Sequence, residues 1–565
     1  MAFAERSKHP LLEALIFSEF KRSGVELSGE EKTWFDAYAA KNKEHIDKYV
    51  KANEEKAVEP KKKQEQQPKV QAAKAPQEAN KKKEKVKEEI PEEYKKEVYS
   101  QRIVRLNKGQ IILPVEGQNN ILVTSALPYV NNVPHLGNLI GAVLSADVFA
   151  RYSRLKGNNT IYICGTDMYG TATEFKAISE GKTPQEVVSH YFEIHKQIYE
   201  DFEIDFDNFI GTAHPKHTDI VQDVFTKSLK NNYFFKKTSD QYFSKKYNIG
   251  LADRFITGTC PDCGFEEAKG DQCDKCGKLQ EPETLVNPKC TLSGEPPEKR
   301  STDHYYLDLL ALEQQIKDFH EKSSKEGKWT SNSISISNSW VKSGLQARCM
   351  TRDLSWGVNV PIEGMNNKVF YVWFDAPIGY ISITADYTDD WEKWWKNPDN
   401  VKLFQFMGKD NVPFHTVLFP ASLIASGDNW TMLHHISTTE YLNYETGKFS
   451  KSNNRGVFGD QVKQMPFLPS CWRYYLLANR PEAADSLFQW HDFKAKVNEE
   501  LLQNPGNLTN RVLKFVYSKY DKKLPSAKPE ELSAYVFSNL VPMLNFSIRL
   551  WPRSLLFVSS WISPS

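Results

Sequence analysis

The segment PHLGN at residues 134–138 follows the apolar run ILVTSAL at residues 121–127. The run, closed by turn residues, predicts a buried strand, and the helical spacing after it predicts a helix that starts near His135. A helix N-terminus above the carboxyl end of a strand favours anions, because free backbone N–H groups point there. Gly137 would let a flat ligand approach the backbone. His135 is therefore a candidate phosphate contact, with an ordinary capping histidine as the alternative.

Two lysines and two serines gather in the loop GKFSKS at residues 447–452. Lysine offers a compact positive charge and serine a hydroxyl donor, so the loop suits a triphosphate. Taken alone, such a loop is more often simply solvated. Its position downstream of PHLGN, across a split parallel sheet, makes the two motifs together specific for nucleotide chemistry.

Two C-x-x-C turns, Cys260 to Cys263 and Cys273 to Cys276, are each followed by glycine. Four thiolates at this spacing are typical of a tetrahedral zinc knuckle with a structural role. A pair of disulfides is the alternative, and a reducing compartment disfavours it. The sequence predicts one structural Zn²⁺ per chain.

The whole composition limits the class of protein. The chain has 565 residues, 40% of them hydrophobic, and a formal net charge of +1. The length allows about three or four domains, and the charge indicates no global attraction to nucleic acid. No apolar run is long enough to span a membrane, and the N-terminus lacks a signal-peptide layout. We therefore expect a cytoplasmic protein with no membrane contact.

Apolar runs that read as strands recur with helical patterns between them, at residues 121–127, 160–164, 367–374, 401–407 and 432–438. This rhythm predicts an α/β fold with a Rossmann-type, doubly wound parallel sheet. Residues 231–365 interrupt the rhythm with turns and the cysteine pairs, and are expected to form an insertion that splits the sheet.

The expected organisation has seven parts. These are a small helical N-terminal appendix (1–50), a Lys/Glu-rich disordered linker (51–110), the first half of the catalytic domain (111–230), the zinc-knuckle insertion (231–365), the second half with the KFSKS loop (366–481), a partial helical domain (482–535) and an anomalous apolar tail (536–565). The linker has too few apolar residues to fold. Its lysine clusters could touch a polyanion, but a solvated linker is favoured.

These motifs carry a family resemblance. Residues 135–138 resemble the His-Ile-Gly-His signature of the class I aminoacyl-tRNA synthetases, and residues 448–452 resemble its Lys-Met-Ser-Lys-Ser signature. The stretches VTSALPYVNNVPHLGN, ICGTDMYGTATE, FYVWFDAPIGY, GKDNVPFH and EYLNYETGKFSKS look like the methionyl-tRNA synthetase family of eukaryotic cytosolic type. The resemblance implies a ligase that uses ATP with Mg²⁺ to form methionyl-adenylate and pyrophosphate. It then transfers the methionyl group to tRNA(Met).

The resemblance also implies the nucleotide site. His135, Asn138, Lys448 and Lys451 would be catalytic, with Asn138 in place of the signature's last histidine. An asparagine amide can still hydrogen-bond ATP. The other implied ATP-binding residues are Gly137, Gly408, Lys409 and Asp410. For the last three, an ordinary strand-end turn is the alternative.

The implied methionine pocket consists of Ala126, Leu127, Tyr129, Asp167, Trp373 and His415. A thioether packs well against aromatic rings, and Asp167 would receive the substrate ammonium. Core packing of a strand residue is the alternative for Trp373, and a turn-forming role is the alternative for Asp167. Met168 departs from the acidic residue expected next to Asp167 in close relatives.

The helical region after residue 481 resembles an anticodon-binding bundle, in which Asn504, Asn510 and Arg511 would contact tRNA. Helix capping or packing is the alternative for these residues. Relatives continue this bundle, whereas here the tail from about Tyr535 replaces it, which puts tRNA reading in doubt.

Two other functions compete with the ligase. A charging-deficient scaffold or tRNA-binding component could dock other synthetases or scaffold proteins through residues 1–50. Another nucleotidyltransferase of the same fold is a third reading, which the pocket aromatics and the zinc knuckle oppose.

Overall fold

The computed structural model describes residues 108–251, 255–270, 273, 275–276, 282–445, 447–450, 455–465 and 467–520. They belong to one compact unit, Val104–Ser565. The expected appendix (1–50), nearly all of the expected linker (51–110), Lys451 and the expected tail (536–565) lie outside the described residues.

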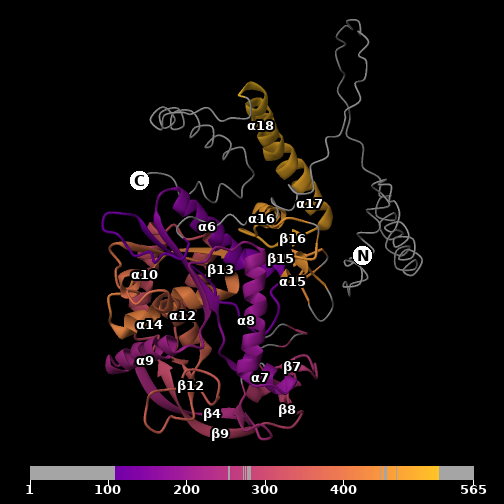
Figure 1. Cartoon of the computed structure of the whole chain (residues 1–565). Coiled ribbons are helices and arrows are strands. Elements are labelled where there is room, and N and C mark those ends of the chain that lie inside the picture. Colours follow the sequence, from indigo (N-terminus) through magenta and orange to yellow (C-terminus); the bar gives the residue numbers. More distant parts are fainter. Residues whose placement is uncertain are drawn as a thin grey trace, which may run out of the picture. The chain divides into compact units, whose positions relative to one another are not determined.

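A five-stranded parallel sheet forms the centre of this unit (Figure 1), with the strand order β14-β13-β1-β2-β3. Each neighbouring pair is parallel, and every residue of β1 is buried. Such burial is expected for a strand covered on both faces. The strands are β1 Asn120–Ser125, β2 Asn159–Thr166, β3 Asn208–Gly211, β13 Val401–Gly408 and β14 Leu433–Thr439. The Rossmann-type fold class is confirmed.

The strand order reverses between β1 and β13. From β1 the chain builds β2 and β3 on one side, and it later adds β13 and β14 on the other. Just past the end of β1, the Ala126 N–H donates to the Phe406 carbonyl of β13 at 2.9 Å. Ligands of open α/β sheets bind outside the carboxyl ends of the strands at such a reversal. A ligand site is therefore expected at the segments that follow β1 and β13.

Helices cover both faces of the sheet. The Tyr162 hydroxyl of β2 donates to the Val143 carbonyl at 3.0 Å, whereas a Cβ at Gly165 would lie 2.6 Å from Ile383 on α12. Residues 162 and 165 point to opposite faces because side chains alternate along a strand. The helices of this part of the chain are η1 Leu139–Val143, α6 Leu144–Leu155, α7 Thr171–Glu180, α8 Pro184–Asp201, α9 Pro215–Lys230, α12 Val372–Tyr387, α13 Glu392–Trp395 and α14 Phe419–Ser426.

The prediction of a strand at residues 367–374 is wrong except at two residues. Only Val369–Phe370 forms a strand, β12, which pairs with β11 (Thr351–Arg352), and helix α12 starts at Val372. Helix α12 is buried on nearly all sides. It therefore lacks the polar face whose period would distinguish a helix from a buried strand.

Between α9 and α12 the chain leaves the central sheet, in the segment where the sequence predicts an insertion. Besides the β11–β12 pair, two small antiparallel sheets form there, in the orders β10-β9-β4-β5 and β7-β6-β8. The elements are β4 Phe234–Ser244, β5 Ile249–Gly250, β6 Ile256–Thr259, β7 Ala268–Lys269, β8 Val286–Cys290, β9 Glu298–Leu307, α10 Glu313–Glu326, α11 Ser331–Lys342 and β10 Arg348–Cys349.

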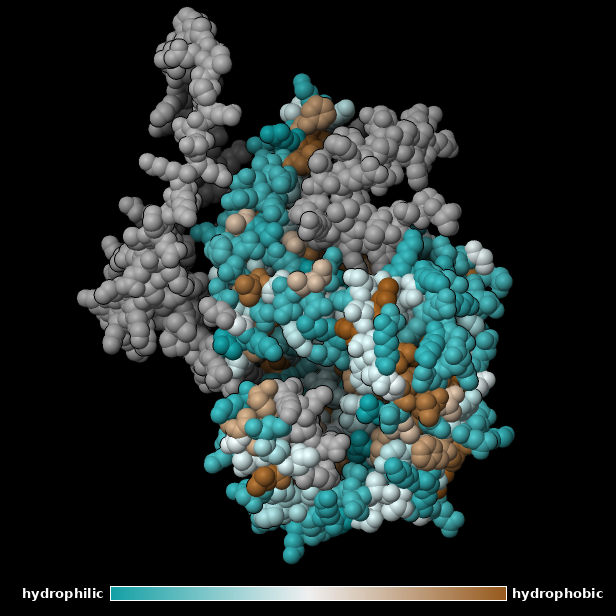
Figure 2. All heavy atoms as spheres, turned by 180° about the vertical axis from the view of Figure 1, so that it is seen from behind, coloured by the Kyte–Doolittle hydropathy of each residue, from teal (hydrophilic) through white to brown (hydrophobic). Residues whose placement is uncertain are grey.

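After β14 the described chain is mainly helical. Its elements are β15 Leu442–Tyr444, α15 Gly459–Val462, α16 Pro469–Ala478, β16 Ser486–Phe488, α17 Trp490–Ala495, η6 Lys496–Gly506 and α18 Asn507–Lys519. Trp472, Phe488 and Phe493 pack together as buried rings. By contrast, α18 exposes apolar side chains such as Leu513 and Phe515, and hydrophobic atoms are visible on it in Figure 2. Within the described ranges, no helix combines the length and apolar character needed to cross a bilayer.

Candidate functional site

His135 caps the helix that begins at the carboxyl end of β1. Its Nδ1 accepts from the Gly137 N–H at 3.1 Å, and its own N–H donates to Asn138 Oδ1 at 3.0 Å, which closes a reciprocal capping box. The capping alternative is therefore present. Burial lowers the pKa of His135 to about 4, so its ring is neutral near pH 7. Because Nδ1 is an acceptor, the ring proton is on Nε2, which can donate to a ligand.

The two expected signature segments meet at His135. The Phe449 ring lies parallel to the imidazole with centroids 4.4 Å apart. The segment after the loop is held to the same turn, because the Gly459 N–H donates to the Pro134 carbonyl at 2.8 Å. Lys448 is exposed, with its Nζ 5.6 Å from the centroid of the Tyr441 ring. The structure thus brings residues 448–450 to the helix N-terminus at residues 135–138.

Gly408, Lys409 and Asp410 lie at the carboxyl end of β13, beside the reversal of the strand order. Lys409 Nζ contacts Glu440 Oε2 at 2.6 Å and also pairs with Asp485. Asp410 accepts a hydrogen bond from the Tyr441 hydroxyl at 2.7 Å. Residues 409–411 form a short 3₁₀ turn, η4, so the predicted strand-end turn is present and its polar groups already have protein partners.

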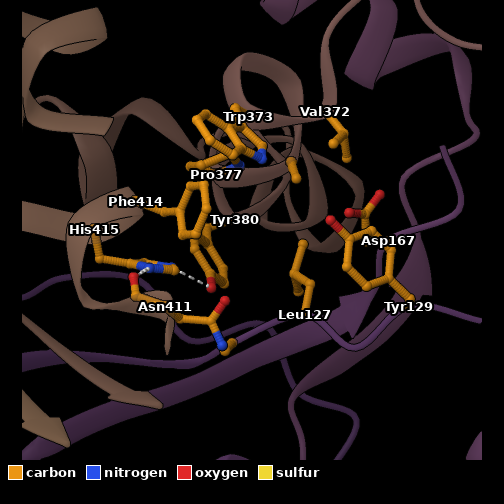
Figure 3. Close-up of a pocket in the computed structure, with 12 residues that line it drawn as sticks. Leu127, Tyr129, Asp167, Val372, Trp373, Pro377, Tyr380, Asn411, Phe414 and His415 are labelled. Atoms are coloured by element: carbon orange, nitrogen blue, oxygen red, sulfur yellow. Dashed lines mark hydrogen bonds between the residues drawn. The ribbon is translucent and has the colours of Figure 1, made fainter. Parts of the chain in front are cut away.

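All six residues expected to bind methionine line one pocket (Figure 3). They come from the segments after β1 and β2, from the first turn of α12 and from η5 (Phe414–Leu418). The other lining residues are Val372, Ala376, Pro377, Tyr380, Asn411 and Phe414. A mostly apolar cavity with a few convergent polar groups is the usual form of a small-molecule site.

One part of the pocket is aromatic. The Trp373 and Phe414 rings meet edge to face, with centroids 4.9 Å apart. Beside them, His415 Nδ1 lies 2.8 Å from the Asn411 carbonyl, and Nε2 lies 2.8 Å from the Tyr380 hydroxyl, as the dashed lines in Figure 3 mark. A carbonyl only accepts, so Nδ1 carries the proton. Burial lowers the pKa of His415 to about 4, so the neutral ring accepts from Tyr380 at Nε2.

Another part of the pocket carries the acid. Asp167 is 3% exposed, and its Oδ1 accepts from the Tyr169 N–H at 3.2 Å. Burial and then the nearby charge of Asp375 raise the pKa of Asp167 well above its ordinary value. Figure 3 shows Asp167 and Tyr129 together, away from Phe414 and His415. A cation that binds beside Asp167 would favour the ionised form of its carboxyl group, because an opposite charge stabilises a buried carboxylate.

The other six lining residues carry no motif in the sequence, but most of them lie at helical spacing from one another or from an expected pocket residue. Trp373, Pro377 and Tyr380 follow the i, i+4, i+7 spacing of a helix face. Asn411 and His415 are likewise separated by four residues. These spacings would have indicated the additional residues if residues 372–387 had been recognised as a helix.

The four cysteines of the C-x-x-C turns form one cluster. Their Sγ atoms all lie within 4.8 Å of one another, with Cys260 to Cys276 at 3.9 Å and Cys263 to Cys273 at 3.6 Å. Disulfide sulfurs would be about 2.05 Å apart. Thiolates about 2.3 Å from a tetrahedral Zn²⁺ would be about 3.8 Å apart. The donor set and its spacing therefore fit a Cys₄ zinc ion.

The residues expected to contact tRNA lie elsewhere in the chain. Asn504 is on η6, and Asn510 and Arg511 are on α18. All three are exposed, and none lines the pocket. The structure thus leaves their side chains accessible to a large partner.

Comparison with known proteins assigns the family. A family profile described as tRNA synthetases class I (M) matches residues 121–513. The chain belongs to this family. The matched region of this class I tRNA synthetase contains the sheet, the pocket and the Cys₄ cluster.

Several eukaryotic relatives of this class I tRNA synthetase are very similar. A probable cytoplasmic methionine–tRNA ligase of Dictyostelium discoideum is 62% identical over 405 residues, which cover 72% of this chain and 55% of the relative. The cytoplasmic methionine–tRNA ligase of Saccharomyces cerevisiae is 54% identical over 428 residues, covering 76% and 57%. The chain thus spans about half the length of the curated relatives it matches.

A solved structure shares the fold. Mycobacterium tuberculosis methionyl-tRNA synthetase bound by methionyl-adenylate aligns with a TM-score of 0.59 at 19% identity. The alignment covers 79% of this chain and 82% of that one.

Proposed function

We propose that this chain is a cytoplasmic methionine–tRNA ligase that activates methionine with ATP and transfers the methionyl group to tRNA(Met). One observation carries the proposal: the six residues expected to bind methionine line a single pocket at the reversal of the strand order. The names of the relatives and the ligand of the solved structure agree with this substrate.

In the proposed reaction, the methionine carboxylate attacks the α-phosphorus of ATP and pyrophosphate leaves. Such a transfer needs aligned reactants and positive charge near the phosphate oxygens. His135 would donate from Nε2, at the start of a helix whose first N–H groups already have acceptors in the chain. Asn138 and Gly137 would complete this phosphate contact, and Mg²⁺ would accompany ATP as part of the substrate.

The KFSKS loop would supply the remaining positive charge. Lys448 and Lys451 would stabilise the leaving pyrophosphate when the loop closes over the nucleotide. Gly408, Lys409 and Asp410 would line the nucleotide side of the site. Lys409 would have to exchange part of its pairing with Glu440 and Asp485 to contact ATP.

Different parts of the methionine pocket would bind the ammonium group and the side chain of the amino acid. Asp167 would pair with the ammonium group, with Tyr129 beside it. Trp373 and His415, with Ala126 and Leu127, would enclose the side chain, since a polarizable thioether packs favourably against aromatic rings.

The other proposed components are structural or macromolecular. Zn²⁺ bound by the four clustered cysteines would stabilise the insertion. Asn504, Asn510 and Arg511 would contact tRNA, and residues 1–50 would bind other synthetases or scaffold proteins.

The test is methionine-dependent exchange between pyrophosphate and ATP, with tRNA charging measured on the same preparation. Exchange with methionine but not with leucine is expected, and exchange with neither would refute the assignment. Lys451→Ala should lower exchange by about two to three orders of magnitude and leave methionine binding nearly unchanged. Lys463→Ala is the control, because Lys463 pairs with Asp201 on α8. Normal exchange by Lys451→Ala would remove that lysine from the mechanism.

A further inference from the structure

Trp356 lies near the end of the insertion, on the segment that returns the chain to α12. A Cβ at the next residue, Gly357, would lie 2.8 Å from the Val369 side chain of β12, so this segment packs closely on β12. Two residues after β12, helix α12 begins with Val372, which lines the methionine pocket. The backbone of Trp356 is therefore held beside the strand that leads into one wall of the pocket.

The side chain of Trp356 reaches the segment after β2, which carries Asp167. Its Nε1 donates to the Met168 carbonyl at 2.7 Å, and its ring meets the Tyr169 ring edge to face, with centroids 5.3 Å apart. An indole N–H can only donate, so the direction of this hydrogen bond is fixed. Trp356 thus contacts both of the residues that follow Asp167.

Met168 is held by its backbone and by its side chain. Besides the hydrogen bond from Trp356, its N–H donates to the Thr212 hydroxyl oxygen at 3.1 Å, and its side chain is 8% exposed. A Cβ at Gly211, the last residue of β3, would lie 2.0 Å from Met168 Cε, so the methionine occupies space that glycine leaves open. Met168, at a position where close relatives are expected to carry an acid, is therefore an apolar anchor next to Asp167.

The carboxyl group of Asp167 depends on this same stretch of backbone. Its Oδ1 accepts from the Tyr169 N–H at 3.2 Å, and the Asp167 N–H donates to the Pro128 carbonyl at 2.9 Å. The direction of the carboxyl group therefore follows the path of the chain from residue 167 to residue 169. The Met168 carbonyl lies in the middle of that path, and Trp356 holds it.

We propose that Trp356 is a positioning residue for the ammonium group of the amino-acid substrate, because it fixes residues 167–169 and so the direction of the Asp167 carboxyl group. This inference rests on the proposed function. Trp356 is not among the residues that line the pocket, so it acts on the substrate through Asp167. A binding group that is already held in its productive direction has less freedom to lose when the ligand arrives.

The test is a double-mutant cycle between Trp356 and Asp167, with methionine binding to the full chain measured by calorimetry. Trp356→Phe removes the indole N–H and keeps an aromatic ring. It should raise the methionine Kd about five- to tenfold, the effect of one lost hydrogen bond. In the Asp167→Asn chain, the same substitution should change the Kd less than twofold, because the group that Trp356 positions is gone. The KM for ATP in pyrophosphate exchange should stay within twofold of the wild-type value.

Trp394→Phe is the matched control. Trp394 is fully buried, and its Nε1 donates to the Ile112 carbonyl at 3.1 Å, with neither residue in the pocket lining. This variant also loses an indole hydrogen bond to a backbone carbonyl, but its methionine Kd should match that of the wild type. Equal increases in the two variants, or an equal effect of Trp356→Phe with and without the Asp167 carboxylate, would indicate a general loss of packing and overturn the inference.

A second variant removes the N–H group and keeps the shape of the ring. Replacing Trp356 with 3-benzothienylalanine puts sulfur in place of the indole N–H in a bicyclic ring of similar size, so this variant decides the test if Trp356→Phe does not fold. It should reproduce the increase in the methionine Kd. An unchanged Kd would overturn the inference.

Failure of the proposed function would give a different result. A wild-type chain that does not bind methionine, or an Asp167→Asn chain that binds it normally, would overturn the proposed ammonium site and this inference with it. Methionine binding that depends on Asp167 but not on Trp356 would overturn this inference alone.

Discussion

Phe449 of the KFSKS loop stacks on His135 of the helix cap, with ring centroids 4.4 Å apart and planes inclined by only 4°. The two residues are separated by most of the catalytic region in sequence. The stack covers one face of the imidazole and leaves Nδ1 bonded to Gly137. It therefore couples the position of the loop to the orientation of the proposed phosphate donor.

Removing the Phe449 ring from this stack should lower the rate of methionine activation more than it weakens substrate binding. Phe449→Leu is expected to lower the rate of pyrophosphate exchange about three- to tenfold, because a ring pair contributes about 0.5–1.5 kcal/mol. The methionine Kd should stay within twofold. Phe515→Leu, at a ring 55% exposed on α18, is the matched control. Equal exchange rates for the two variants would show that the stack has no role in loop closure.

The pH dependence of methionine binding follows from Asp167. Its pKa is raised by burial and by Asp375, so its carboxylate form exists only above that raised value. Methionine affinity should therefore fall as the pH drops through the raised pKa. The ligand-free chain should respond in the opposite sense, since protonation of Asp167 favours the folded state in that window. Calorimetric titration and thermal melts across the same pH series measure both effects.

Asp167→Asn should imitate the protonated state at every pH. It should raise the methionine Kd at least about 30-fold, for the roughly 2 kcal/mol or more lost when one partner of a buried charge pair is removed. The melting temperature of the ligand-free variant at pH 8 should not fall below that of the wild type. A variant that binds methionine normally would exclude Asp167 as the ammonium partner.

The strands show how much of this architecture the sequence contains. The apolar runs that became β1, β2, β13 and β14 are continuous and mostly buried, so composition alone identified them. The short strand β3 has three half-buried residues and lacks such a run. It was missed because its pairing with β2 is a tertiary contact that no local pattern records.

The pocket, unlike the strands, could not be predicted from local patterns in the sequence. Its six expected residues came from a family resemblance, since nothing in the spacing of Ala126 and Trp373 indicates that they meet. Residues 372–374, at the start of α12, were predicted as the end of a strand, because the residues of this helix are buried on nearly all sides. That error concealed Tyr380, whose contact with His415 depends on the helical period.

Tyr380 should matter for stability as well as for the pocket. Tyr380→Phe leaves the Nε2 of His415 without its donor in a buried place, which should lower the free energy of unfolding by about 1–3 kcal/mol. Methionine affinity should fall several-fold, because the His415 ring loses its fixed orientation. Tyr306→Phe is the control, since its hydroxyl donates to Ser239 in the insertion. Urea unfolding measures the stability of both variants, and methionine titration measures their affinity. Equal values for Tyr380→Phe and Tyr306→Phe would contradict this role of Tyr380.

The Cys₄ cluster should hold one metal ion per chain. Sulfur separations of 3.6 and 3.9 Å suit four thiolates around Zn²⁺, and no second group of three or more potential ligands occurs among the described residues. Cys260→Ser should remove the zinc measured by mass spectrometry and make the insertion sensitive to proteolysis. Cys471→Ser, at a half-buried thiol on α16, should keep one zinc. Two zinc ions in the wild type, or none, would contradict the assignment, because one Cys₄ site binds a single ion.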